Sequence, residues 1–462
     1  MMRRGYDASM GRIGPCVLAL TIVTFMVAFA SREVAGQEHH HPAPGPSPSP
    51  EPSPSPSAQM PMGPEMPMQH AAHGGHEMHG MLGPYAMERE SSGTSWQPDS
   101  ALMEGIHLMR GPWMLMIHGF ASLVFDHQGG LRGDDKVFGP TMGMLMAQRP
   151  AGEGTFGASA MLSVDPGTVG KTGYPLLLQT GEAADGRPLI DRQHPHDMFM
   201  ELAATCSHPI GGDRGSLFLY AAIPGEPALG PPTFMHRFSG MEIPEAPISH
   251  HWMDSTHITF GVLTGGVTWR GLKVDASAFR GREPDEHRWN IESPSLDSYS
   301  ARLQYNPTAS WSLQASAGHL HSPEELEPDV DLWRSSASVT YDRPRPHGAW
   351  QTTLAWGRND KTDQEPQDAF LVESTLRAGR HTVFARVEHV AKDELFTDEP
   401  LSHEIFEVQR LTAGYLFDLL RASHLAGGIG GLVSFIGIPE SLSAAYDGQP
   451  VSYMVFVRAQ IR

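Results

Sequence analysis

Histidine and methionine side chains are concentrated near the N-terminus of the chain, on both sides of a proline- and serine-rich stretch at residues 42–57. Imidazole nitrogen suits Cu(II), Ni(II) and Zn(II), whereas thioether sulfur selects Cu(I). A flexible segment with both ligand types could therefore capture copper in either oxidation state. The alternative is a low-complexity, extended spacer in which these residues are incidental. We favour metal binding, by His39, His40, His41, Met60, Met62, Met66, Met68, His70, His73, His76, Met78, His79 and Met81.

Two later segments, residues 166–197 and 223–257, also bring together side chains that can bind metals. They contain His194, His196, His236, His250 and His251. If both segments fold into the interior, these imidazoles could line a metal site. The last two are adjacent, so in an extended segment they would point to opposite sides and at most one would serve. For these segments we favour the alternative, a structural plug, held by pairs between Arg192 and aspartate and by histidine–carboxylate hydrogen bonds.

Five further methionines are clustered in the first part of the region after residue 110. They are Met114, Met116, Met142, Met144 and Met146. Their thioethers could add soft ligands to such a site. Methionine is also an ordinary filler of irregular apolar surfaces, so this patch gives only weak support for metal binding.

Enzymatic function finds little support in the spacing of the polar residues. The sequence has no nucleophile elbow, no phosphate-binding loop and no His-Glu-x-x-His zinc helix. A barrel lipid hydrolase, with serine and histidine on its outer wall, is the remaining enzymatic alternative. We therefore assign no catalytic residue and no obligatory cofactor, and treat copper ions as the candidate ligand.

The first 36 residues have the features of a secretory signal peptide. A positively charged start (Arg3, Arg4 and Arg12) precedes the apolar run at 17–30, and small residues follow at 34–36. No later run approaches the roughly 20 apolar residues that a transmembrane helix needs. If the mature chain spans a membrane, we expect it to do so with strands.

The charge balance excludes one class of partner. The chain has 33 basic and 52 acidic residues, for a formal net charge of -19. A nucleic-acid partner is therefore not expected, because phosphate binding needs basic surface. The negative charge suits either the attraction of cations or plain solubility.

From residue 111 onward the sequence consists of short segments in which apolar and polar residues alternate. In residues 298–305, for example, Tyr299, Leu303 and Tyr305 share one face, while Ser300 and Arg302 share the other. Period-2 alternation places each set on its own side of a sheet. In a membrane barrel the apolar set faces lipid and the polar set fills the lumen.

The connections between these segments alternate between short and long, as in outer-membrane barrels and unlike soluble sandwiches. Short connections fall near 149–153, 211–214, 270–271, 306–309, 342–348, 378–380 and 418–423. Long ones fall near 127–138, 166–197, 223–254, 281–295, 320–330, 358–368, 391–402 and 437–449. The pattern predicts an all-β fold, an antiparallel transmembrane β-barrel of about 16 strands (14–16). The predicted organisation is a signal peptide (1–36), a disordered Pro/Ser/His/Met-rich arm (37–110) and the barrel (111–462).

Aromatic residues near strand ends are candidates for the belts that mark the two membrane interfaces. They are Trp113, Trp269, Tyr299, Tyr305, Trp311, Trp333, Trp350 and Trp356. The last predicted strand, residues 451–462, alternates cleanly and resembles the C-terminal assembly signal of outer-membrane proteins. It differs from the usual form by ending in Ile461-Arg462 rather than in an aromatic residue.

The layout resembles that of the copper-resistance outer-membrane protein B family, in which a Met/His-rich N-terminal arm precedes a β-barrel. The resemblance is carried by residues 60–81 and by the barrel pattern. The segments 174–182, 191–201 and 249–260 are similar to an uncharacterised group of bacterial outer-membrane proteins. The resemblance implies a barrel in the outer membrane with its arm in the periplasm, acting in copper or other transition-metal handling.

Two other expectations complete the sequence-based account. The expected partners are outer-membrane lipid, the barrel-assembly machinery and periplasmic metal-handling proteins. The alternative function is a general or solute-specific porin whose arm is a spacer without a role of its own.

Overall fold

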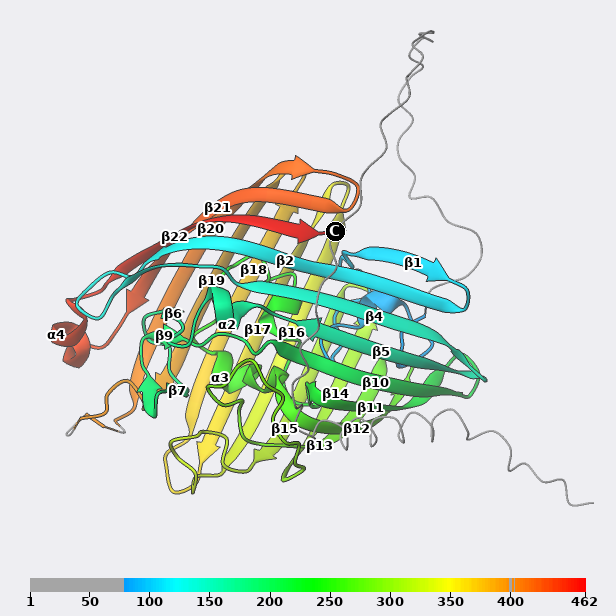
Figure 1. Ribbon diagram of the computed structural model, residues 1–462, viewed down its shortest axis with the longest axis horizontal. Helices are drawn as coiled ribbons and strands as arrows, with labels where there is room; N and C mark the ends of the chain where they lie inside the picture. The colour runs from blue at the N-terminus through cyan, green and yellow to red at the C-terminus, as the bar shows by residue number, and fades with distance from the viewer. Residues whose placement is uncertain (1–78, 399–400, 403) are drawn as a thin grey trace, which may run out of the picture.

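The computed structural model describes residues 79–398, 401–402 and 404–462. The predicted signal peptide and the predicted ligands from His39 to Met78 lie outside these residues. Within the described residues, sixteen antiparallel strands close into a barrel, as the alternation predicts (Figure 1). The ring starts with β2 (Trp113–His127), β4 (Thr141–Ala151) and β5 (Gly154–Leu162), and it closes where β22 (Val451–Ile461) pairs with β2.

The rest of the ring follows in chain order, each strand paired with the next. These strands are β10 (Phe199–Ile210), β11 (Gly215–Gly225), β12 (Thr259–Trp269), β13 (Leu272–Phe279), β14 (Ser298–Thr308), β15 (Trp311–Leu320), β16 (Leu332–Arg345), β17 (Gly348–Lys361), β18 (Gln367–Ala378), β19 (His381–Lys392), β20 (Phe406–Arg421) and β21 (Leu425–Gly437). Two short strands also pair with β2: β1 (Ile106–Arg110) and β3 (Asp135–Phe138). β3 comes just before β4 in the chain and pairs with the same edge of β2 as β4 does. The four shortest strands form two small two-stranded sheets, β6 with β9 and β7 with β8, in the loop before β10: β6 (Tyr174–Pro175), β7 (Glu182–Ala184), β8 (Arg187–Leu189) and β9 (Arg192–Gln193).

The two faces of the strands have opposite character. On β14, Tyr299 is 54 % exposed on the outside, whereas Ser298 is 2 % exposed toward the lumen. The alternation continues along the strand, with Leu303 exposed outside and Arg302 buried inside. The same pattern on β22 leaves its valines outside. The predicted inward and outward sets are therefore confirmed, and a one-residue slip of register would exchange them.

Aromatic side chains form two belts on the outer wall. Near the short connections, the Trp311 and Tyr341 rings lie 4.7 Å apart, and the Tyr341 and Trp350 rings lie 5.8 Å apart. Near the long connections, the Tyr299 and Trp333 rings lie 5.9 Å apart. Indole and phenol rings prefer the headgroup level of a bilayer, so these belts bound the apolar band that faces lipid.

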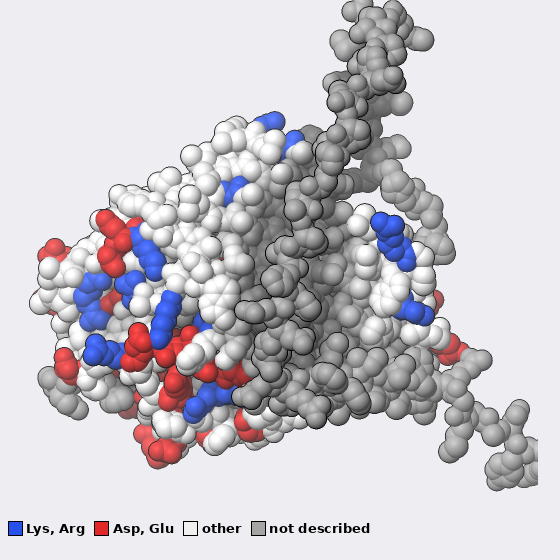
Figure 2. Space-filling view, in the orientation of Figure 1, with Lys and Arg blue, Asp and Glu red and all other residues white. Residues whose placement is uncertain are grey.

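The connections separate into two rims, as predicted. Tight turns of two to four residues, such as 211–214, 270–271 and 379–380, lie at one end, which we call the short-turn rim. The long segments lie at the other end, the long-loop rim, with α4 (Ser443–Tyr446) at its edge (Figure 1). Charged side chains gather at the long-loop rim and are few over the outer wall of β20–β22 (Figure 2). Among the described residues, no helix has the length and apolar character to cross a membrane.

The predicted boundary between arm and barrel at residue 110 is wrong. Residues 79–105, which we call the inner segment, fold into the lumen at the short-turn rim, and residues 106–110 form β1. The polar composition of the inner segment suggested disorder, but Leu82, Tyr85 and Trp96 pack together against Phe218 of the wall. Glu90 accepts hydrogen bonds from the backbone N–H groups of Met81 and Leu82, both at 2.8 Å.

Candidate functional site

The lumen contains a second internal element, formed by residues 226–258 between β11 and β12, which we call the plug. It includes η2 (Phe234–His236), α3 (His250–Met253) and η3 (Ser255–His257). Nearly all of its residues are buried, although the segment connects two strands. Loops normally run over the surface because their backbone needs water or another partner. Here the lumen wall supplies those partners.

Arg237 is the central ionic contact of the plug. Its guanidinium lies 2.6 Å from a carboxylate oxygen of Asp254, within the plug, and 2.8 Å from one of Glu373, on β18. All three side chains are buried, and Glu373 also pairs with Arg386 of β19 at 3.3 Å. Burial works to raise the pKa of Asp254, but Arg237 and His250 outweigh it, so this pKa lies below its ordinary value. The carboxylate therefore stays charged, and the pair holds the plug to the wall.

Further contacts fix the plug along β19–β22. Glu245 pairs with Arg410 of β20 at 2.8 Å. Ser249 donates to Glu388 of β19 at 2.7 Å. Buried charges are stable only when paired and hydrogen-bonded, so each contact needs the plug in this position.

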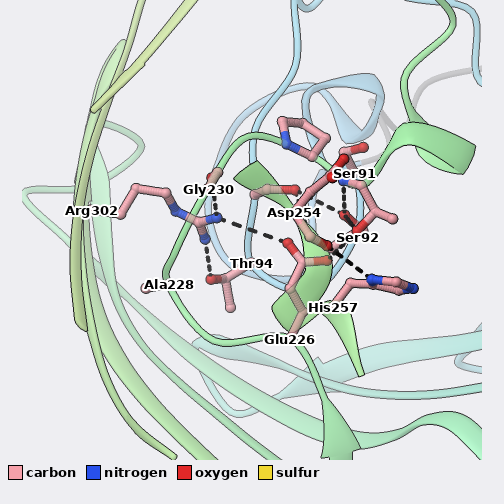
Figure 3. A network of polar contacts seen from close by, with 12 residues as sticks. Ser91, Ser92, Thr94, Glu226, Ala228, Gly230, Asp254, His257 and Arg302 are labelled. Carbon is pink, nitrogen blue, oxygen red and sulfur yellow. Dashed lines mark hydrogen bonds and ion pairs between the residues drawn. The ribbon is translucent and has the colours of Figure 1, made fainter. Parts of the chain in front are cut away.

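The inner segment, the plug and the wall meet at one network (Figure 3). Arg302 of β14 donates to the Thr94 hydroxyl at 2.7 Å and to the Gly230 carbonyl at 3.2 Å. Its guanidinium also lies 4.0 Å from Glu226. Glu226 accepts from the Thr233 hydroxyl at 3.0 Å. One wall arginine therefore holds both internal elements together.

These elements close the lumen of this conformation along its length. On β18, lumen-facing Gln367, Glu373 and Arg377 lie at three depths, and each is at most 2 % exposed. On the neighbouring β19, Lys392, Arg386 and Thr382 are equally buried. Open 16-stranded porins leave an aqueous channel at this position. Here the space is filled by protein.

The loop between β5 and β10 covers the plug from the long-loop rim. Arg288, from the loop between β13 and β14, binds this cover through Glu182 and through Asp197, the latter at 3.0 Å. Arg192 pairs with Asp134 at 3.1 Å. The structural alternative considered for these segments, a plug held by arginine–aspartate and histidine–carboxylate contacts, therefore describes their geometry well.

The structure brings four of the five predicted loop histidines together. The rings of His194 and His251 lie 6.0 Å apart, and those of His250 and His251 lie 5.4 Å apart. His196 joins them through His257, whose ring lies 5.6 Å from that of His196 and 5.2 Å from that of His250. His257 was not singled out from the sequence. His250 and His251 do not lie on an extended segment, so the argument that at most one of them would serve does not apply: α3 places both in the interior.

These histidines are engaged with carboxylates rather than arranged around one point. The Nδ1 atoms of His196 and His250 lie 2.8 Å from Asp165 and 2.7 Å from Asp254. Burial lowers the pKa of His194, His250 and His257, which favours neutral rings. Across the described part of the chain, no group of three or more His, Cys, Asp and Glu side chains is placed to hold a metal ion.

His236 lies apart from this cluster, beside a methionine-lined cavity of about 90 Å³ between the inner segment, the plug and the β2–β4 wall. Its ring lies 5.8 Å from that of His118. The lining methionines are Met87, Met103, Met116, Met142, Met144, Met146, Met235 and Met241. The two remaining predicted ligands within the described residues, His79 and Met81, start the inner segment, and Met81 is buried there.

Sequence reasoning missed the charged residues that hold the internal elements, above all Arg237, Glu373 and Arg302. Glu373 and Arg302 occupy lumen-facing positions of alternating strands, so their inward direction was predictable. Their partners were not, since Arg237 and Glu373 are 136 residues apart.

No protein-family model and no curated protein sequence matches this chain. Among solved structures, the chain is similar to Salmonella typhi OmpF in complex with daunomycin, at 12% identity and a TM-score of 0.47, over 77% of this chain and 100% of that one. It is also similar to an anion-selective porin from Comamonas acidovorans, at 10% identity and a TM-score of 0.43, over 75% and 99%. Vibrio cholerae OmpT matches at 8% identity and a TM-score of 0.43, over 77% and 100%.

The class of the protein follows from its own architecture. A closed barrel of sixteen strands, with an apolar outer band and two aromatic belts, is an outer-membrane β-barrel of porin-like build. It differs from an open pore in its filled lumen.

Proposed function

We propose that this protein is a solute-specific outer-membrane channel that its internal plug keeps closed in the conformation described. The observation that carries the proposal is the burial of lumen-facing side chains at every depth of β18. Passage of a solute would require the plug to move. The plug is attached through its two ends to β11 and β12, so it can leave the wall without leaving the protein.

The two rims support one orientation in the membrane. Outer-membrane barrels have short periplasmic turns and long extracellular loops. The short-turn rim would then face the periplasm and the long-loop rim the outside. The inner segment contacts the short-turn rim, where the Ser100 N–H donates to the Ala309 carbonyl at 2.9 Å and Arg89 donates to the Arg270 carbonyl at 2.9 Å. The preceding arm would therefore lie in the periplasm.

Single-channel recording of the full-length protein in planar bilayers tests this proposal. A closed channel with a movable plug should show brief, infrequent openings. A steady, ohmic conductance from the moment of insertion would contradict it, because it would mean that the lumen is open without any rearrangement.

Metal handling is the second candidate, with the arm as a collector of copper ions for the barrel and for periplasmic metal-handling partners. The methionine- and histidine-lined cavity beside the inner segment favours it. A Cu(I) and Cu(II) titration with and without residues 37–78 tests this role. The deletion must end before His79, since the inner segment belongs to the folded barrel. Equal binding by both forms would contradict a collecting role for the arm.

A further inference from the structure

We propose that His118, Met144, Met161 and His236 form a binding site for a soft monovalent cation, Cu(I) or its analogue Ag(I). The site lies inside the barrel. It deepens the metal-handling candidate by naming a place and a cation class, and it needs neither the arm nor an opening of the plug.

The wall contributes three ligands in one row across neighbouring strands. His118 of β2 is paired with Met144 of β4, and Met144 is paired with Met161 of β5. Residues directly opposite on adjacent antiparallel strands have Cβ atoms about 4.5–5.5 Å apart and project from the same face of the sheet. Met144 and Met161 are buried on the lumen side, so the row faces the interior.

The plug contributes the fourth ligand. His236, at the end of η2, lies with its Nε2 atom 3.3 Å from the Met161 sulfur, and its ring lies edge-on to that of His118, 5.8 Å away. At Zn(II), which is also a d¹⁰ ion, bonds are about 2.0–2.1 Å to imidazole nitrogen and about 2.3 Å to cysteine sulfur. A nitrogen and a sulfur 3.3 Å apart can therefore bind the same ion with little adjustment.

The composition of the cavity favours a soft ion. The cavity has two carboxylates, and both are engaged elsewhere. Glu90 accepts from the Met81 and Leu82 N–H groups, and Glu104 binds Arg377. With both carboxylates engaged, the cavity offers hard divalent ions no free anionic ligand, whereas its thioethers select Cu(I).

The competing interpretation is a structural one. Methionine fills irregular space, and the contact between His236 and Met161 would then be an N–H···S hydrogen bond. Both interpretations keep the cavity folded, but they differ in whether the sulfur atoms respond to a soft cation.

The experiment uses the full-length protein in detergent, labelled with ¹³C at the methionine methyl groups, and Ag(I) as the probe. Variants M144L and M161L assign two signals and, combined, remove both sulfur atoms at nearly constant volume. M109L is the matched control, because Met109, on β1, is 69 % exposed and lies outside the methionine row. A thermal melt of each variant shows that the barrel is intact.

We expect Ag(I) to shift the Met144 and Met161 methyl signals, and the double variant to bind one fewer Ag(I) ion per chain than the wild type. The M109L variant should bind as many ions as the wild type. Unshifted Met144 and Met161 signals, or an unchanged number of bound ions in the double variant, would overturn the proposal. Shifts at the arm methionines alone would overturn this site while leaving metal collection by the arm in place.

Discussion

Replacing Arg237 by methionine removes the positive charge that two buried carboxylates share. Asp254 lies 2.6 Å and Glu373 2.8 Å from the guanidinium, and neither is exposed to water. Breaking a buried ion pair by removing one partner costs about 3–5 kcal/mol, because the remaining charge is left uncompensated. Movement of the plug would let water reach both carboxylates, so this free-energy cost destabilises the closed state and not the open one.

A cost of about 3–5 kcal/mol corresponds to a roughly 150- to 4,500-fold rise in the ratio of open to closed channels. Single-channel recording measures this ratio as open probability. The control is R358M, since the pair of Arg358 with Asp368 is on the outer wall and half-exposed. Such pairs contribute about 0–1 kcal/mol, so this variant should behave like the wild type.

A compensating variant separates loss of charge from general damage. In R237M/D254N the carboxylate that lost its only arginine partner becomes a neutral amide, while Glu373 keeps its pair with Arg386 at 3.3 Å, so open probability should fall back toward that of the wild type. Equal open probability in the wild type, R237M and R358M, with all three folded, would refute the reasoning that this ion pair holds the plug closed.

Three other outcomes are expected. W96A removes the most buried aromatic ring of the inner segment and should cost about 3–5 kcal/mol of its packing free energy. Trypsin should then cleave at Arg89 while the barrel stays resistant. Unchanged cleavage would show that other contacts hold the inner segment in place. V455R places a charge on the lipid-facing middle of β22 and should reduce the free energy of unfolding in urea by about 2–4 kcal/mol. V451R, at the end of the same strand, should reduce it by only about 0–1 kcal/mol. Equal effects of the two variants would argue against the proposed membrane depth. Finally, burial lowers the pKa of His236 to about 3 in the folded protein, whereas in the unfolded chain this side chain takes up a proton near pH 6.5. The unfolded state therefore binds more protons between these values, so stability should decline as pH falls below about 6.5, and H236Q should flatten this slope in urea titrations at several pH values.

The wall of the barrel was predictable from the sequence because its determinants are local. Residues 298–305 show by alternation alone which side chains face lipid, and turns such as 270–271 mark where strands end. The interior was less predictable. The inner segment has no periodic pattern, and Trp96 is buried only because strands that are far from it in the sequence surround it in the fold. α3 has four residues, too few to show helical periodicity, so the positions of His250 and His251 could not be inferred.

The methionine row illustrates the same limit. The sequence showed methionines on early strands, but not that Met144 stands between His118 and Met161 in register. Nor did it show that a histidine from the plug would reach that row. Pairing of strands and return of a loop into the lumen are both non-local, and they decide which of many histidines and methionines can act together.

The central claim, that movement of the plug opens the channel, is tested most directly by a reversible tether. The hydroxyl oxygens of Ser239 in the plug and Thr353 in β17 lie 2.8 Å apart, so S239C/T353C places two thiols within reach of a disulfide. Added to R237M, the tether should keep the channel closed under oxidising conditions, and reduction should restore frequent openings in the same membrane. Open probability that is high in both states, with the disulfide shown to form, would contradict the account.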